Sequence, residues 1–223
     1  MQNTDVLIIG SSAAGLATAI SGKNNYPDKK FMVLRKEDKV MVPCGIPYIF
    51  GSLENSDQNI LPADAKFDGL GIEHQIGEVK EVDRENKVCT LTDGQQIQYE
   101  KLVMATGSTP KVPTWMEGHD LENVFTIPKN KAVLDTISNN LKGLDKVVVI
   151  GGGFIGVELS DELNKAGKEV RIVEILPHVL NVAFDKEFAE RAENILSDRG
   201  VDVRTNSGVK KINGEGGKVA SVE

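Results

Sequence analysis

The chain contains one local pattern twice: an apolar run that leads directly into a glycine-rich turn. Val6-Leu-Ile-Ile9 precedes Gly10-Ser-Ser-Ala-Ala-Gly15, and Val147-Val-Val-Ile150 precedes Gly151-Gly-Gly-Phe-Ile-Gly156. A short apolar strand, a tight turn and a helix form the start of a β-α-β unit, whose two strands lie parallel in one sheet. The repeat therefore predicts an α/β chain with two Rossmann-like nucleotide-binding domains, each built in layers from a parallel sheet and helices.

Both copies of the pattern continue in the way that a β-α-β unit requires. After the first turn, residues 16–21 favour a helix that Gly22 would stop, and residues 31–34 form an apolar strand. After the second turn, a helix is expected to reach Lys165, followed by a strand over residues 169–173. An amphipathic helix over 187–197 and a strand over 201–204 extend the second copy.

The region between the copies has a different character. Short alternating segments at 75–79, 87–91 and 96–99, separated by turn residues, predict an antiparallel β-meander inserted in the first domain. A further apolar strand is expected at 102–105, and the proline-containing stretch 109–128 is the best linker candidate.

These boundaries divide the chain into a first domain over residues 1–113 and a second over residues 114–223. The second domain ends within a further predicted meander over 209–222, so we expect it to be incomplete at its C-terminus.

Composition limits the partners and the compartment. Twenty-six Lys and Arg against 33 Asp and Glu give a net charge of −7, which argues against nucleic acid or an anionic membrane as partner. Two cysteines are too few for a disulfide scaffold, and the three histidines show no metal-ligand spacing, so we assign no metal. No apolar run reaches the ~20 residues of a bilayer span. The uncharged stretch 6–22 follows no Lys or Arg, unlike a signal peptide, so we expect a cytoplasmic protein.

The second glycine-rich turn has the complete dinucleotide-binding spacing, with glycine at 151, 153 and 156. In this spacing the first glycine allows the turn, the second lets a pyrophosphate approach the backbone, and the third lets the helix pack on the strand. Glu174 closes the next strand, where a carboxylate can accept both ribose hydroxyls and repels a 2′-phosphate. NAD(H) is therefore favoured over NADP(H), the alternative being a turn that binds no ligand.

The first turn departs from this pattern at two places. Ser12 stands where the middle glycine is expected, and Arg35-Lys36-Glu37 follows the next strand in place of a single acidic residue. Either Glu37 reaches a ribose, or Arg35 and Lys36 contact the adenosine end of a nucleotide. Two such turns in one chain favour a protein that binds two nucleotides.

Cys44 lies in the segment Val42-Pro-Cys-Gly-Ile-Pro-Tyr48, where Pro47 suits the first turn of a helix. A thiol at a helix N-terminus has a lowered pKa and is enriched in nucleophilic thiolate. The alternative is a small residue packed in a turn, which is the reading we favour for Cys89 in the meander.

Together these motifs resemble the single-cysteine branch of the FAD-dependent pyridine nucleotide–disulfide oxidoreductases. That branch includes coenzyme A-disulfide reductases, NADH:polysulfide or persulfide reductases, NADH oxidases and NADH peroxidases. The resemblance is carried, in the family's order, by Gly10–Gly15, Pro43-Cys-Gly-Ile-Pro-Tyr48, Ala105-Thr-Gly-Ser-Thr-Pro110, and Gly151–Gly156 with Glu158 and Glu174.

The resemblance implies two cofactors, FAD and NADH, and a set of residues for each. The residues implied for FAD are Gly10, Ser11, Ser12, Ala13, Ala14, Gly15, Arg35, Lys36, Glu37, Pro43, Val79, Ala105, Thr106 and Gly107. Those implied for NADH are Gly151, Gly153, Phe154, Ile155, Gly156, Glu158 and Glu174, with Phe154 where the family usually has a Tyr that swings over the flavin. Cys44 is implied as the catalytic thiol, which receives electrons from the flavin and attacks a disulfide or polysulfide sulfur.

Departures from the family pattern bear on the electron acceptor. Ala13 stands where oxidases and peroxidases typically have a His, and Pro43 is typical of the sulfur- and CoA-linked members. Lys23, and with it Lys66, matches a basic position for CoA phosphates, so CoA is a candidate ligand or part of the substrate. The family continues into a C-terminal dimerisation domain, so the full-length enzyme is expected to be a homodimer and this chain a fragment of it.

Three alternatives remain at this stage. One is an NADH oxidase that reduces O2 through a Cys44 sulfenate. Another is an NADH-dependent reductase of a small iron–sulfur electron carrier, which needs no cysteine. The last is a truncated nucleotide-binding module without catalysis. The sequence favours an enzyme that passes electrons from NADH through FAD to a small-molecule sulfur acceptor.

Overall fold

The computed structural model describes all residues, 1–223, and they form two compact units. One unit comprises Met1–Pro43 and Ile60–Thr109, and the other comprises Cys44–Asn59 and Pro110–Glu223. Residues 43–59, which we call the Cys44 segment, belong to the second unit except for Pro43, although their position in the sequence had assigned them to the first domain. The domain limits 1–113 and 114–223 stay a prediction.

The first unit is a six-stranded sheet with the order β3-β2-β1-β6-β5-β4. Strand β1 is central and pairs in parallel with β2 and β6, and β3 pairs in parallel with β2. Strands β4 and β5 turn back in antiparallel pairing, which confirms the meander. The strands are β1 (Gln2–Ile9), β2 (Phe31–Arg35), β3 (Glu73–Ile76), β4 (Val79–Asp83), β5 (Val88–Leu91) and β6 (Gln96–Met104).

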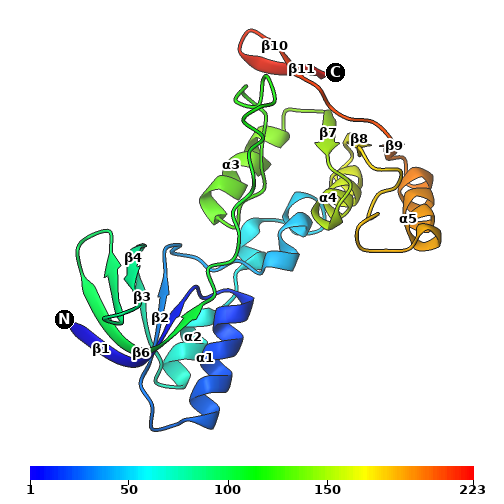
Figure 1. The fold of residues 1–223 in the computed structure, drawn as a ribbon. Helices are drawn as coiled ribbons and strands as arrows, with labels where there is room; N and C mark the ends of the chain where they lie inside the picture. The colour runs from blue at the N-terminus through cyan, green and yellow to red at the C-terminus, as the bar shows by residue number, and fades with distance from the viewer. The chain divides into compact units, whose positions relative to one another are not determined.

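Two helices, α1 (Ala13–Asn25) and α2 (Ala63–Gly69), cover one face of the parallel strands (Figure 1). Successive residues of β1 point to opposite faces of the sheet, as strand geometry requires. Ile8 packs toward the helices with Ala19 and Phe67, whereas Leu7 and Ile9 pack toward the meander. Both faces of β1 are thus buried, which explains its continuous apolar sequence.

Two local predictions were wrong for steric and pairing reasons. Gly22 lies inside α1, which continues to Asn25. A Cβ at this position would lie 2.5 Å from the Phe31 ring, so the glycine makes room for that ring. The predicted strand 75–79 is divided between β3 and β4. The first of these two strands joins β2 in parallel, and only the second belongs to the meander.

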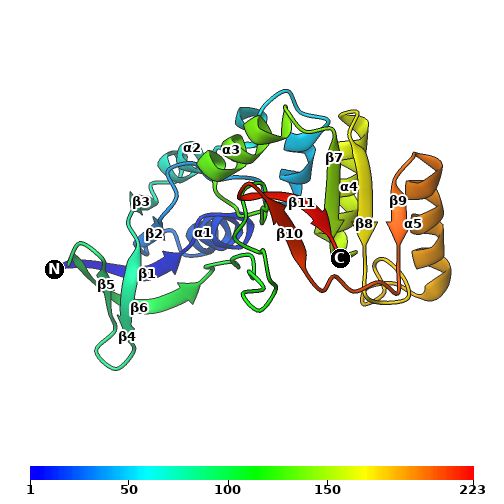
Figure 2. The same cartoon turned by 90° about the horizontal axis from the view of Figure 1, so that it is seen from above.

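The second unit has a three-stranded parallel sheet, β7-β8-β9, with α4 following β7 and α5 following β8 (Figure 2). Helix α3 precedes the sheet, and an antiparallel hairpin of β10 and β11 follows it. Their bounds are α3 (Lys131–Leu141), β7 (Lys146–Ile150), α4 (Phe154–Lys165), β8 (Glu169–Val173), α5 (Lys186–Asp198), β9 (Asp202–Arg204), β10 (Ile212–Glu215) and β11 (Lys218–Val222). Two β-α-β units in one chain confirm the predicted fold class.

The Cys44 segment contains three one-turn 3-10 helices: η1 (Pro43–Gly45), η2 (Pro47–Phe50) and η3 (Ser56–Asn59). Pro47 is the first residue of η2, as the sequence predicted, where its missing N–H leaves no bond unmade. No helix in the structure combines the length and the apolar character needed to span a bilayer.

Candidate functional site: two nucleotide cradles and a cysteine segment

The second glycine-rich turn connects β7 to α4 with the geometry of a dinucleotide cradle. Gly151 has φ +105°, which L side chains rarely adopt, and its N–H donates to Val173 O at 2.8 Å. A Cβ on Gly156 would lie 1.9 Å from Gly151 O, so only glycine lets the helix start against the turn. Gly153 is the N-cap of α4, and no side chain caps the helix there. The N–H groups of the first turn of α4 therefore remain available to bind an anion.

Glu174 follows β8 and touches the same turn. One of its carboxylate oxygens accepts a hydrogen bond from Gly152 N at 2.6 Å, and the other accepts from Leu176 N at 2.7 Å. A carboxylate offers about four acceptor sites, so these two bonds leave capacity for ribose hydroxyls. These bonds hold Glu174, the residue predicted to bind a ribose, against the turn.

The loop after Glu174 is also fixed to the turn. Val179 is fully buried, and its N–H donates to the Glu193 carboxylate at 2.9 Å. The next residue, Leu180, donates its N–H to Gly152 O at 2.7 Å. His178 Nδ1 lies 3.2 Å from the same Glu193 carboxylate. Helix α5, which carries Glu193, therefore holds this loop beside the glycine-rich turn.

Three exposed aromatic rings form a row at the start of α4. The ring centroids of Phe154 and Phe184 lie 5.8 Å apart in an edge-to-face arrangement, and those of Phe184 and Phe188 lie 6.4 Å apart. Phe154 is 55% exposed and Phe188 65% exposed. Exposed aromatic groups at the mouth of a predicted nucleotide cradle offer a surface for a flat ring to pack on.

The first glycine-rich turn, between β1 and α1, has almost the same geometry. Gly10 has φ +106°, and its N–H donates to Leu34 O at 2.7 Å. A Cβ on Gly15 would lie 1.8 Å from Gly10 O. Ser12 takes the N-cap position with φ −78°, close to the −74° of Gly153, so a serine fits this backbone without strain. Its side chain does not cap α1 and instead donates to Met41 O at 3.4 Å.

Arg35, at the end of β2, has its guanidinium buried in the protein. Its Nη1 and Nη2 lie 2.7 Å and 2.9 Å from the two carboxylate oxygens of Asp64, and its Nε donates to Glu37 O. This arrangement shapes the loop that follows β2, while Lys36 is exposed and Glu37 half-buried. The predicted contacts of these three residues with adenosine stay predictions.

The remaining predicted residues of the first unit lie at its strand ends and helices. Ala105 directly follows β6, and its N–H donates to Ile9 O at 2.8 Å, beside the turn. Thr106 and Gly107 are exposed and Val79 is half-buried. Lys66 is exposed on α2.

Lys23, the first of the two predicted CoA-binding lysines, already has partners inside the protein. Its Nζ donates to the carbonyl oxygens of Pro27 and Lys29 at 2.8 Å and 3.0 Å. An ammonium group has three donors, so one remains for a phosphate.

Cys44 is an exposed, unpaired cysteine in η1, and Cys89 is fully buried in the core of the first unit. Burial raises the pKa of the Cys89 thiol, which keeps it protonated and supports its packing role. A Cβ on Gly45 would lie 1.9 Å from Asn59 Oδ1, so the turn after Cys44 is closely packed. The helix that follows the thiol is a single 3-10 turn, which offers few aligned peptide dipoles.

The residues that hold the Cys44 segment in place were not predicted from the sequence. Glu162 in α4 is 2% exposed, and its carboxylate accepts hydrogen bonds from Ser52 N and Ser52 Oγ. Burial acts to raise the pKa of Glu162, but the donors on Lys165 and Ser52 outweigh it and leave the pKa below its ordinary value. An acidic residue at an inward position of an amphipathic helix was the available signal.

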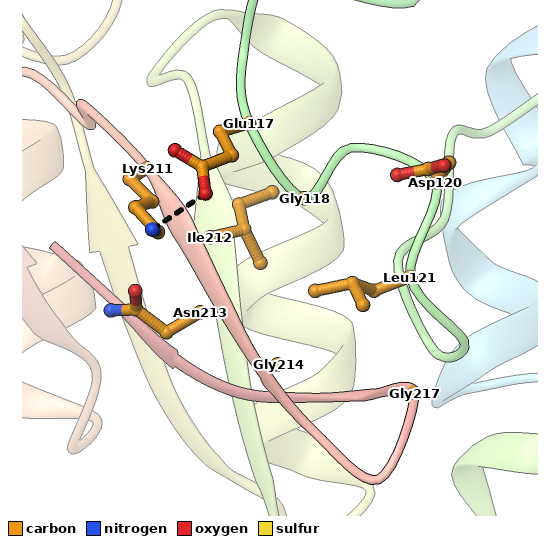
Figure 3. Close-up of a pocket in the computed structure, with 9 residues that line it drawn as sticks. All are labelled: Glu117, Gly118, Asp120, Leu121, Lys211, Ile212, Asn213, Gly214 and Gly217. Atoms are coloured by element: carbon orange, nitrogen blue, oxygen red, sulfur yellow. Dashed lines mark ion pairs between the residues drawn. The ribbon is translucent and has the colours of Figure 1, made fainter.

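A cavity of about 430 Å³ lies elsewhere in the second unit, between the loop 117–121 and the β10–β11 hairpin (Figure 3). Glu117 and Lys211 form an ion pair of 2.6 Å at its rim, as the dashed line shows. The N–H of Ile212 donates to Glu117 O, so the hairpin is joined to this loop. None of the predicted site residues lines this cavity, and Glu117 and Lys211 at its rim are paired with each other.

Comparison with known proteins identifies the class that this geometry defines. Residues 4–223 match the family model described as pyridine nucleotide-disulphide oxidoreductase. The chain belongs to this family, which confirms the resemblance, and FAD and NADH are the cofactors of the family. The residues present fit these cofactors, because each turn leads into a helix whose N-terminus no side chain caps, so that backbone N–H groups remain for a pyrophosphate.

Individual relatives differ in the activity that their names give. The chain is 33% identical to an NADH oxidase of Enterococcus faecalis, over 97% of this chain and 50% of that protein. It is 34% identical to an NAD(P)H coenzyme A polysulfide/persulfide reductase of Pyrococcus horikoshii, over 94% and 48%. The chain thus spans about half the length of the curated relatives it matches.

The solved structures that the chain resembles also include both a persulfide reductase and an NADH oxidase. The NAD-dependent persulfide reductase from A. fulgidus matches 98% of this chain and 42% of its own, with a TM-score of 0.83 and 31% identity. The water-forming NADH oxidase from Lactobacillus brevis, solved bound to NADH, matches 99% and 50%, with a TM-score of 0.84 and 26% identity.

Proposed function

We propose that this chain is the nucleotide-binding part of a flavoprotein that passes electrons from NADH through FAD to a small-molecule sulfur acceptor, at Cys44. The acceptor class is a disulfide, a CoA-disulfide, a polysulfide or a persulfide. The observation that carries the proposal is the combination of two dinucleotide cradles with one exposed, unpaired cysteine. The similarity to the P. horikoshii and A. fulgidus reductases supports it.

The first unit would hold FAD. Its pyrophosphate would bind at the N-terminus of α1, between Gly10 and Gly15, and the residues after β6, Ala105 to Gly107, would line the same cradle. Bound there, FAD supplies the two-electron carrier that no side chain can provide. Arg35, through its contacts with Asp64 and the loop after β2, shapes the adenosine end of the cradle.

The second unit would hold NADH. The pyrophosphate would bind at the N-terminus of α4, and Glu174 would accept the ribose hydroxyls with the capacity left after its bonds to Gly152 and Leu176. A 2′-phosphate would face the Glu174 carboxylate, so NADH is preferred over NADPH. Phe154, Ile155 and Glu158 would contact the nicotinamide end.

Cys44 would perform the sulfur chemistry. Its thiolate attacks one sulfur of an acceptor disulfide, forms a mixed disulfide and releases the other sulfur as a thiolate that takes up a proton. Two electrons that originate in NADH then break the mixed disulfide, which restores the Cys44 thiolate and releases the second thiol. The exposure of Cys44 allows a small acceptor to approach it.

The test is anaerobic titration of the purified, FAD-reconstituted protein with NADH, followed by turnover with CoA-disulfide or polysulfide. We expect a long-wavelength absorption band from the Cys44 thiolate beside oxidised FAD, and turnover that Cys44→Ser abolishes. Cys89→Ser is the matched control, because that thiol is buried. A protein that stays colourless, or a Cys44→Ser variant with full activity, would refute the proposal. The latter outcome would favour a reductase of an iron–sulfur carrier.

A second candidate is an NADH oxidase that reduces O2 through a Cys44 sulfenate, and the names of several relatives favour it. Ala13 argues for the sulfur acceptor, because it offers no proton donor beside the first turn. Turnover with O2 alone, which sulfur acceptors do not increase, would establish the oxidase instead.

The proposal also covers the compartment, the oligomeric state and the binding of CoA. We place the enzyme in the cytoplasm, where the two unpaired cysteines would stay reduced, and we expect the full-length protein to be a homodimer. Lys23 and Lys66 would bind CoA phosphates if the acceptor is a CoA-disulfide.

A further inference from the structure

Helix α4, which begins at the second glycine-rich turn, also holds the segment that carries Cys44. Glu162 lies on the buried side of this helix, and one of its oxygens accepts hydrogen bonds from Ser52 N at 2.7 Å and Ser52 Oγ at 2.5 Å. Its other oxygen lies 2.7 Å from Lys165 Nζ. Hydrogen bonds to an ionised carboxylate are stronger than those between neutral groups, and the three distances at Glu162 are typical of such charged bonds.

The backbone of the segment also contacts α4 directly, at Gly51. A Cβ on Gly51 would lie 2.2 Å from the carbonyl oxygen of Glu162, so only glycine permits this approach. Ile49 and Phe50 of η2 are buried. The turn closes on itself, because Leu53 N donates to Tyr48 O at 2.8 Å. The turn over residues 47–53 is therefore held on α4 at Gly51 and Ser52.

A second contact point fixes the far end of the segment independently. Ser56 Oγ donates to Asp135 of α3, and Asp57 lies 3.1 Å from Lys131 Nζ. Lys131 and Asp135 also pair with each other at 2.8 Å. Loss of the Glu162 contact would thus loosen the turn over residues 47–53 and leave η3 attached.

A buried carboxylate is not the residue that stability alone would select. Taking a charge out of water has a large free-energy cost, and an apolar side chain of similar size often packs at least as well. A carboxylate that binds both the N–H and the hydroxyl of one serine instead fixes the orientation of that residue. Glu162 therefore has a geometry suited to setting the path of the chain.

We infer that Glu162 is a positioning residue for Cys44, which acts through Ser52 by fixing the turn over residues 47–53 on α4. The consequence for catalysis rests on the proposed function, whereas the contact itself does not. Cys44 would then be placed by the same helix whose first turn is predicted to bind NADH.

The first test measures hydrogen exchange at the backbone amides of residues 44–59, without flavin or substrate. In Glu162→Ala we expect exchange of the amides around residues 51–53 to accelerate about tenfold or more, since the lost bonds involve a charged acceptor. The amides of η3 should keep their rate. Asp161→Ala is the matched control, because Asp161 lies on the same helix but pairs with Lys165 and with Arg199, which follows α5, and makes no hydrogen bond or ion pair with the segment.

Two further variants keep the test decisive. Glu162→Gln retains an acceptor for Ser52 and should recover most of the protection from exchange. A purely steric role would instead predict equal protection with any side chain of that size, including one that has no acceptor. Ser52→Ala removes only the hydroxyl and should show a smaller acceleration at the same amides if Glu162→Ala does not fold.

The second test measures turnover of the FAD-reconstituted enzyme with a sulfur acceptor. We expect kcat of Glu162→Ala to fall about tenfold to a hundredfold with KM for NADH unchanged, since a small displacement of a reacting atom has that effect. Equal exchange in Glu162→Ala and Asp161→Ala, or accelerated exchange with unchanged kcat, would overturn the inference. Because exchange needs no flavin, failure of the contact is distinguishable from failure of the proposed function.

Discussion

The two glycine-rich turns have nearly identical backbones but different surroundings. Gly10 and Gly151 have φ values of +106° and +105°, and Gly15 and Gly156 approach the carbonyl of the first glycine equally closely. However, a Cβ on Gly10 would lie 2.1 Å from Ala105 O, whereas one on Gly151 would meet nothing within 4 Å. Identical local geometry therefore does not imply identical constraint.

The reason for the difference is the place of each strand in its sheet. Strand β1 is central, and β6 brings Ala105 against the first turn. Within residues 1–223, strand β7 pairs with β8 alone, and none of these residues lies within 4 Å of a Cβ on Gly151. The ends of the second strands differ too, because Arg35 bonds inward to Asp64 whereas Glu174 bonds to the turn itself.

The largest expected effect comes from adding one methyl group to the first glycine of each turn. Gly10→Ala combines the unfavourable φ with a backbone clash, and we expect a loss of about 3 kcal/mol or more in the free energy of unfolding of the first unit. Gly151→Ala has the strain alone and should lose about 1–2 kcal/mol. Hydrogen exchange at β1 and at β7 measures the two units separately, and equal losses would remove the contrast.

The second expected effect concerns the residues after the second strands. Glu174→Ala should weaken NADH binding by about 1.5–3 kcal/mol, because it removes a charged acceptor of the ribose and a contact of the turn. Glu37→Ala should have a smaller effect on FAD binding, because Glu37 contributes its backbone oxygen to Arg35. Isothermal titration with NADH and with FAD measures both. A larger loss for Glu37→Ala would reverse the assignment.

A smaller effect is expected at the aromatic row, which only the second turn possesses. Phe184→Ala removes the edge-to-face partner of Phe154, and we expect a loss of about 0.5–1.5 kcal/mol in NADH binding. Phe188→Ala is the matched control, because the Phe188 ring packs on Phe184 and not on Phe154. Titration of both variants with NADH gives the comparison. Equal losses would show that Phe184 does not act through Phe154.

The smallest effect is expected where the turns differ most in sequence. Ser12→Gly gives the first turn the glycine that the second has at Gly153. Because both residues have negative φ and Ser12 makes one long hydrogen bond, we expect a change of only a few tenths of a kcal/mol in stability. Thermal unfolding and FAD titration measure it. A tenfold gain in FAD affinity would show that the serine hinders the ligand.

Much of this architecture follows from local chemistry that the sequence displays. Gly10, Gly151 and their partners at 15 and 156 could be interpreted directly, because a positive φ and a helix packed on a turn both require glycine. The meander could be recognised from alternation and turn residues. The role of Gly22 could not be predicted, because it depends on the Phe31 ring, which packs against this glycine only in the folded chain.

The candidate site was predictable to the same extent. Cys44 and Glu174 stand in motifs, so the sequence identified them. Glu162 stands in no motif. Its inward position on an amphipathic helix could indicate burial, but not its partner, because Ser52 is distant in the sequence.

The sequence by itself determined that two β-α-β units exist, where their turns lie and which thiol is exposed to chemistry. Tertiary structure decided that Ala105 after β6 lies against the first turn, which carboxylate is buried and which unit holds the Cys44 segment. The physical reason is range: backbone conformation at a glycine is set by adjacent atoms, whereas burial and pairing depend on residues that only folding brings together.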